Sequence, residues 1–246
     1  MASVTTGRTA AAVTVGLMSP RSVLLGTVTV VVLALAGCTG SGSTDAATGT
    51  SAEPAAAGAA AAAEAAADPA VANTPADAAL AVALRAPDLP AGWSVQANPL
   101  AEGAKLTDNP SLAGICGATF ASEAHRTAKH PVVGLDGSGT PQISSEAIAY
   151  DSADAAATAV QELVQAFGSC PADQYTFEPG PSAQGLAANS VVFQYRLADG
   201  TTQVVVAQTR GQVLSVLIGE DPAATAAAGR SIAVRISALP AAAIGG

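Results

Sequence analysis

The sequence of 246 residues has few aromatic and few charged side chains, 3% and 12% of its residues respectively. All eight aromatic residues follow residue 92. The first third of the chain therefore lacks the large side chains that fill a protein core. The length alone would allow one or two domains. The aromatic distribution favours a single folded domain in the later part of the chain.

Basic residues are also scarce, since 10 Lys and Arg stand against 19 Asp and Glu, a net charge of −9. They form no run anywhere in the chain. Nucleic acids are bound by clustered Lys and Arg that displace counterions, and anionic lipid surfaces attract basic clusters in the same way. The composition argues against a nucleic-acid partner and against electrostatic docking on a membrane.

A long hydrophobic run is missing as well. The apolar stretch at 23–36 has 14 residues, whereas a membrane-spanning helix needs about 20. It follows Arg21 and ends at small residues, a pattern typical of a secretory signal. The closing motif Leu35-Ala36-Gly37-Cys38 resembles the lipobox of bacterial lipoproteins.

The lipobox resemblance implies that residues 1–37 are a signal peptide and that the Cys38 thiol carries a diacylglyceryl group. Several acyl chains give stable membrane anchoring. We therefore expect a lipid-anchored protein at the outer face of the cytoplasmic membrane, in the cell envelope, with the membrane as a partner through Cys38. The alternatives are an uncleaved anchor and a plain secreted protein.

Residues 38–79 are rich in alanine and contain no aromatic side chain. Such a segment cannot bury enough apolar area to offset the backbone entropy lost on folding. It is predicted to be a disordered tether, with a helical stalk as the alternative. A single domain at 80–240 and a flexible tail at 241–246 complete the predicted organisation.

The domain is predicted to be α+β, because two amphipathic helices accompany several strands. The helix at 152–168 has an apolar stripe of Val160, Leu163, Val164 and Phe167, and the final helix after Asp221 has one of Ile232, Ile236 and Leu239. A three-strand meander is expected at 190–197, 202–210 and 212–218, after earlier strands at 93–97 and 142–150 and a short helix at 76–84. Residues 98–140 are expected to be loop-rich, with a helical piece at 118–129. We expect one antiparallel sheet with the two main helices packed on one face.

Cys116 and Cys170 remain once Cys38 is modified. Outside the cytoplasm such a pair is expected to form a disulfide, although two free thiols are the alternative. No Cys-x-x-Cys motif occurs, so a thioredoxin-like redox role has no support.

Catalytic motifs are absent: the sequence has no Gly-x-Ser-x-Gly, no P-loop and no Gly-x-Gly-x-x-Gly. His125 and His130 would point about 140° apart on a helix, and no third ligand supports a metal site. They are predicted to be a surface-loop pair. Arg196 and Arg210 on adjacent strands could meet at an anion, but exposed hairpin arginines are favoured. Trp93 is expected to pack on the core rather than line a groove.

The opening Asp88-Leu89-Pro90-Ala91-Gly92-Trp93 and the helix end Phe167-Gly168-Ser169-Cys170-Pro171 resemble the exported sensor-domain lipoproteins of actinobacteria. These are similar to the extracellular domain of a mycobacterial serine/threonine kinase, whose two disulfides contrast with the single pair available here. The resemblance spans residues 84–240. It implies a helix-backed antiparallel sheet with a ligand cleft, and it supplies no functional residue.

The sequence therefore predicts a lipid-anchored binding or sensor domain that is not an enzyme and needs no cofactor or metal. Its ligand, a small molecule or a protein, is not identified. One alternative is a carrier of an apolar cell-envelope molecule, which needs a cavity of several hundred Å³. The other is a hydrolase in which His125 or His130 lies within hydrogen-bond reach of a serine.

Overall fold

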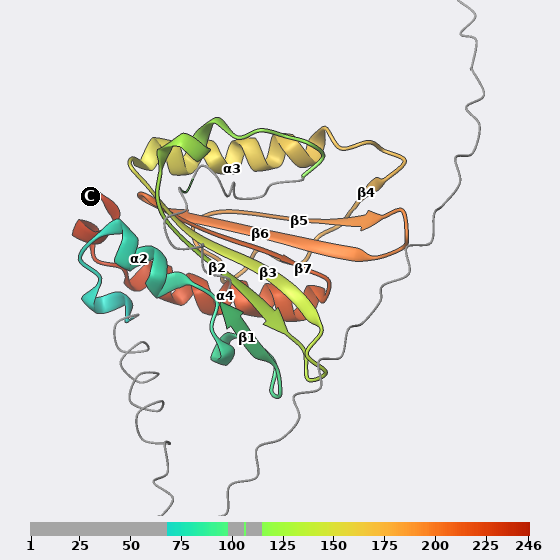
Figure 1. The fold of residues 1–246 in the computed structure, drawn as a ribbon, viewed down its shortest axis with the longest axis horizontal. Coiled ribbons are helices and arrows are strands. Elements are labelled where there is room, and N and C mark those ends of the chain that lie inside the picture. Colours follow the sequence, from blue (N-terminus) through green and yellow to red (C-terminus); the bar gives the residue numbers. More distant parts are fainter. Residues whose placement is uncertain (1–67, 98–105, 107–114) are drawn as a thin grey trace, which may run out of the picture. The chain divides into compact units, whose positions relative to one another are not determined.

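The computed structural model describes residues 68–97, 106 and 115–246. These residues belong to a compact unit at 50–246, which is distinct from the unit at 1–49. They form one antiparallel sheet of seven strands in the order β1-β2-β3-β7-β6-β5-β4, together with three α-helices (Figure 1). The predicted α+β class is confirmed. Within these described residues, no helix is long and apolar enough to span a membrane.

Seven strands and three α-helices, with short 3₁₀ turns between them, make up the described part of the chain. The strands are β1 Ser94–Ala97, β2 Arg126–Leu135, β3 Pro141–Tyr150, β4 Tyr175–Glu178, β5 Asn189–Leu197, β6 Thr202–Arg210 and β7 Val213–Gly219. The helices are α2 Pro75–Val82, α3 Ala153–Gly168 and α4 Pro222–Ala238, and the 3₁₀ turns are η1 Pro69–Val71, η2 Ala86–Asp88, η4 Ala121–His125 and η5 Ala241–Ile244.

The predicted meander is confirmed as β5, β6 and β7, which pair in sequence order. Gly200 takes a positive φ of 90° in the first turn, a conformation that glycine adopts without steric cost. The meander joins the earlier strands through β7, which pairs with β3.

The helices cover both faces of the sheet, which differs from the expected packing of the two main helices on one face. Leu163 and Phe167 of α3 pack with Leu214 of β7, whereas Ile232 of α4 and Val82 of α2 belong to the cluster on the other face (Figure 1). The physical reason lies in β7, where all five residues from Val213 to Leu217 are buried. A strand that is apolar on both sides needs cover on both sides.

The folded domain begins earlier and ends later than predicted. Thr74 and Asp77 form a capping box at the start of α2, and Ala78 and Ala79 are fully buried. The tether prediction is therefore wrong for residues 69–79, because alanine lets this helix lie close to the sheet. The flexible-tail prediction for 241–246 is also wrong, since Ile244 is buried and its carbonyl accepts a hydrogen bond from Gln212 N.

Residues 126–135, expected to be part of a loop-rich region with a helical piece, form the ten-residue strand β2. The helical piece shrinks to the 3₁₀ turn η4. The short edge strand β4 was likewise not predicted. Both strands extend the sheet beyond the elements that periodicity identified.

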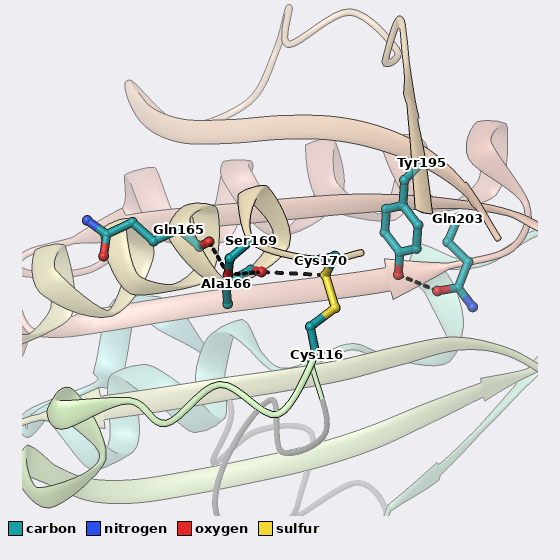
Figure 2. Close-up of a disulfide and its surroundings, with 7 residues drawn as sticks. All are labelled: Cys116, Gln165, Ala166, Ser169, Cys170, Tyr195 and Gln203. Carbon is teal, nitrogen blue, oxygen red and sulfur yellow. Dashed lines mark hydrogen bonds between the residues drawn. A yellow bond between two sulfur atoms is a disulfide. The ribbon is translucent and has the colours of Figure 1, made fainter. Parts of the chain in front are cut away.

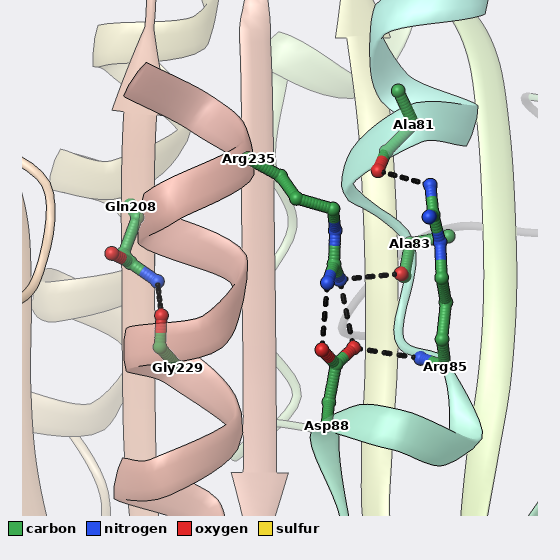
Figure 3. Close-up of polar contacts among 7 residues, drawn as sticks. All are labelled: Ala81, Ala83, Arg85, Asp88, Gln208, Gly229 and Arg235. Carbon is green, nitrogen blue, oxygen red and sulfur yellow. Dashed lines mark hydrogen bonds and ion pairs between the residues drawn. The ribbon is translucent and has the colours of Figure 1, made fainter. Parts of the chain in front are cut away.

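A buried ion pair attaches α4 to the segment after α2. The Arg235 guanidinium donates from both terminal nitrogens to the Asp88 carboxylate, at 2.6 and 2.7 Å (Figure 3). It also donates to the Ala83 carbonyl at 3.0 Å. This two-pronged arrangement is the geometry in which arginine and carboxylate interact most strongly, so it fixes where α4 lies on the sheet.

Candidate ligand-binding groove

An open groove of about 540 Å³ lies between α4, the end of β6 and the segment at 185–189. This volume falls within the range of roughly 300–1,000 Å³ that is typical of small-molecule sites. The lining residues are Gly185, Leu186, Ala187, Ala188, Asn189, Thr209, Arg210, Ala233, Val234, Ile236 and Ser237. The groove is a cleft between a helix and the sheet, the feature that the sensor-domain resemblance leads us to expect.

The α4 wall of the groove is apolar. Ala233, Val234 and Ser237 follow each other at helical spacing, so they share one face of α4. The helix begins at Asp221, whose carboxylate accepts hydrogen bonds from Ala223 N and Ala224 N, both at 2.9 Å. Val234 is 69% exposed. This apolar side chain is therefore accessible to a ligand in the groove.

The buried side chain of Gln208 holds both walls. Its Nε2 donates to the Gly229 carbonyl of α4 at 2.9 Å (Figure 3). Its Oε1 accepts from Ala187 N of the facing wall at 2.8 Å. Gly229 permits this close approach, because a Cβ there would lie 3.0 Å from Val206 and 3.2 Å from Leu186. One amide on β6 therefore sets the separation of the walls.

The polar residues of the groove gather where β6 meets the end of α4. Arg210 Nη1 donates to the carbonyls of Ile236, Ser237 and Leu239 at 2.7–2.9 Å. The last carbonyls of a helix lack the usual i+4 partner; the Ile236 carbonyl also accepts from Leu239 N at 3.3 Å. Arg210 therefore has a structural role that its place in the sequence did not reveal.

The two meander arginines do not meet at one anion. Arg196 pairs with Thr202 and Arg210 pairs with Val213, so they lie at opposite ends of β6. Arg196 is about half exposed and forms an ion pair with Glu178 at 2.7 Å. The favoured interpretation, an exposed hairpin arginine, holds for Arg196.

The two histidines lie on different elements. His125 ends η4, and its Nδ1 is 2.9 Å from Asp151 Oδ2, with both side chains about half exposed. His130 lies within β2 rather than on a surface loop, and its Nε2 is buried without a hydrogen-bond partner. Burial lowers the pKa of His130 below its ordinary value of 6.5. No cluster of metal-ligating side chains occurs among residues 68–97, 106 and 115–246.

A smaller cavity of about 270 Å³ places His125 beside two serines, Ser122 and Ser152. Ser122 Oγ donates to Glu162 at 2.6 Å, and Ser152 Oγ accepts from Ala155 N at 3.2 Å, which caps α3. In the part of the chain that the structure describes, neither serine has a hydrogen bond to His125. The hydroxyls stabilise the starts of η4 and α3 and do not form the nucleophile–base pair that a hydrolase needs.

The predicted disulfide between Cys116 and Cys170 is present, with the two Cα atoms 5.3 Å apart (Figure 2). It attaches the segment before η4 to the residues that follow α3. Beside it Tyr195 donates to the Gln203 amide oxygen (Figure 2). The Tyr195 ring also packs on Phe167. Trp93 packs on the cluster beneath α2 and α4, as expected. Cys38, the predicted lipidation residue, lies outside the described residues.

No protein-family model matches the chain, and neither does any curated protein. The lipobox and the sensor-domain resemblance therefore remain predictions. Sequence reasoning also left the ligand-binding residues open. The groove is formed by the segment at 185–189, the end of β6 and one face of α4. Arg210 is the one lining residue that the sequence analysis considered as a ligand-binding candidate.

Proposed function

We propose that this protein is a lipid-anchored extracytoplasmic binding domain without catalytic activity, which holds a small, largely apolar molecule in the groove beside α4. The observation that carries the proposal is the groove itself, with about 540 Å³ between apolar walls. Burial of apolar surface is worth about 25 cal/mol per Å². A ligand that covers these walls gains affinity from an area that is otherwise exposed to water.

The walls are held apart before any ligand arrives, which supports a binding role. Gln208 bridges Ala187 and Gly229, and Arg235 fixes α4 through Asp88. A preformed site avoids the entropic cost of ordering its walls when the ligand binds. The groove is open along one side, and this favours binding or sensing over the enclosed transport that a carrier of an apolar envelope molecule would need.

Native mass spectrometry of the full-length protein, purified from the envelope of the cells that make it, tests the proposal. We expect an additional mass from a retained small molecule on the wild-type protein. Val234→Asp should lose it, because the substitution places a charge on the apolar wall. Val164→Asp is the matched control, since Val164 is an exposed helix valine, 44% accessible, on α3 and away from the groove.

Two outcomes would reject the groove as the binding site: a wild-type protein without retained mass, or equal retention by Val234→Asp and the wild type. Digestion of the same sample tests the anchor separately. An amino-terminal peptide that begins at Cys38 and carries acyl chains is expected. An unmodified Cys38 within a longer peptide would contradict the lipid anchor and leave the groove proposal standing.

A further inference from the structure

We propose that the occupant of the groove is an anionic amphiphile, with its apolar chain along α4 and its carboxylate or phosphate headgroup against Arg210. This inference rests on the proposed function, because it names the class of ligand for the same site. It is carried by the distribution of charge around the groove and by the hydrogen-bonding capacity that Arg210 retains.

The groove has an unusual charge for this chain. Arg210 is the one ionisable residue in its lining, and no Asp or Glu contributes. The whole sequence has 19 acidic residues against 10 basic ones. A basic, acid-free cleft on an acidic protein attracts anions and holds them against the repulsion of the remaining surface.

Arg210 also differs from most of the other cations that the structure describes. Arg126, Lys129, Arg196 and Arg235 each form an ion pair with a glutamate or an aspartate. No carboxylate of the described residues lies within ion-pair distance of Arg210, and its hydrogen bonds to them all come from Nη1. Among the described residues, its Nη2 and Nε have no hydrogen-bond partner, so they can bind a ligand.

These two free nitrogens suit an oxyanion. A guanidinium presents its N–H groups as a planar fork that matches the oxygen spacing of a carboxylate or a phosphate. Asn189, Thr209 and Ser237 also line the groove, but the Ser237 hydroxyl donates to the Val234 carbonyl at 2.7 Å. The headgroup is therefore assigned to the guanidinium of Arg210 alone.

The rest of the groove suits an apolar chain. Leu186 lies on one wall and Val234 on the other. The Arg230 side chain lies against Gly185, where a Cβ would be 3.1 Å from Arg230 Cδ. Like Arg210, Arg230 forms no ion pair with any described residue. We assign the headgroup to Arg210 because this residue lines the groove, whereas Arg230 is not among the lining residues.

Photolabelling of the full-length chain in nanodiscs of zwitterionic lipid tests the inference. The probes are three diazirine amphiphiles of equal chain length with a carboxylate, a phosphate or a neutral alcohol head. Labelling is read by mass spectrometry of peptides from 185–189 and α4. A charge-assisted pair stabilises a complex enough to give about tenfold stronger labelling by an anionic probe than by the alcohol. The carboxylate and phosphate arms distinguish a fatty-acid-like from a phospholipid-like ligand.

Arg210→Gln should reduce labelling by the anionic probes to the level of the alcohol. Arg196→Gln, an exposed arginine at the other end of β6, should leave the preference intact. Arg210 also caps α4, so Arg210→Gln could fail to fold. A second measurement therefore uses the wild-type protein alone. In the wild type, raising the salt to about 1 M, where the screening length is about 3 Å, should weaken anionic labelling and spare the alcohol.

The outcomes separate the two proposals. Equal labelling of the groove by all three probes, unchanged in salt, would overturn anion recognition and leave a purely apolar binding site. Groove peptides that no probe labels would overturn both the ligand class and the proposed function. If a folded Arg210→Gln protein is still labelled more strongly by the anionic probes than by the alcohol, the headgroup does not bind at Arg210 and this inference is rejected.

Discussion

At the scale of single residues, Gln208 shows what the sequence could not reveal. It follows a run of valines and an alanine in β6, where a polar residue reads as the solvent side of a strand. In the folded protein it is fully buried and bridges α4 to the opposite wall. Its partners Ala187 and Gly229 are 21 residues away in either direction, and no local pattern indicates such pairings.

Replacing Gln208 by leucine should destabilise the protein and disturb the groove. The change leaves Ala187 N–H without its partner and removes the second hydrogen bond of the Gly229 carbonyl, which keeps its bond within α4. We expect a decrease of about 1–3 kcal/mol in the free energy of unfolding, measured by urea denaturation, together with reduced ligand retention. Gln194→Leu is the control, since Gln194 is half-buried and bonded to Glu178. A Gln208→Leu protein as stable as this control would contradict the role given to Gln208.

The arginines and histidines show the same limit of sequence reasoning. Their number and spacing led us to expect no metal or catalytic cluster. Whether each side chain is exposed, buried or paired depends on contacts from distant segments. Arg210 meets α4, and His130 lies beneath α2 with an unpartnered buried nitrogen. Residue type identified these arginines and histidines as candidate site residues. Their actual roles depend on tertiary contacts that the sequence does not show.

At the scale of elements, prediction succeeded where one face is apolar and the ends are marked. Helix α3 begins after its Ser152 cap, and α4 begins at Pro222 after Asp221, as the sequence indicated. Within α3 the expected stripe is only partly right, because Val164 is exposed and alanines at 156, 159 and 166 are buried instead. Alanines make much of the packing contact of this helix. Because alanine occurs on both the buried and the exposed face, the hydrophobic periodicity of the sequence is weak.

Strand β2 escaped prediction because its core face is not simply apolar. It contains Pro131 and Gly134, which are uncommon in strands, and a nearly buried Lys129 that pairs with Glu146 of β3 at 2.9 Å. Its buried charges remove the alternation that would identify a strand. The groove could not be predicted for a related reason, since its walls come from separate elements whose packing had to be known first.

The disulfide is the element-scale link with the clearest test. Cys116 and Cys170 are separated by 54 residues, and closing a loop of this size restricts the unfolded chain by about 4 kcal/mol in the chain-entropy model. Cys116→Ser with Cys170→Ser should therefore lower the thermal midpoint clearly. A reducing agent should lower the thermal midpoint of the wild type and leave the midpoint of the double variant unchanged. A midpoint of the wild type that is insensitive to reduction would contradict this contribution.

At the scale of the whole molecule, stability should fall on acidification in two stages. Burial lowers the pKa of His130 below 6.5, and hydrogen bonds lower the pKa of five carboxyl groups below their ordinary values of 3.8 to 4.5: Asp77, Asp136, Asp151, Glu178 and Asp199. In both cases the unfolded chain takes up the proton first. Stability is therefore lost as the pH falls, from about 6.5 for His130 and from about 4 for the carboxyls.

The alkaline side behaves in the opposite way. Burial raises the pKa of Tyr150 and Tyr195 above 10.0, so the unfolded chain releases these protons first and stability is lost above that pH. We expect urea midpoints to be highest between about pH 7 and pH 9. His130→Gln should flatten the decrease between about pH 6.5 and pH 5 and leave the lower carboxyl stage. An unchanged slope in this variant would show that His130 does not carry the first stage.

The strand order has a consequence for the sequence of events in which the chain is assembled. β1 to β3 form one local block and β4 to β7 another, and the two join solely through β3 and β7 among the described strands. Strands β1 to β3 can pair with one another early. The β3–β7 pairing, in which Ile143 pairs with Gly219, forms only after β7 has been made. The sheet cannot close until the chain has emerged through β7, and the helix α4, which builds one groove wall, comes later still. The groove is thus among the last features that the chain can complete when it folds from its amino terminus.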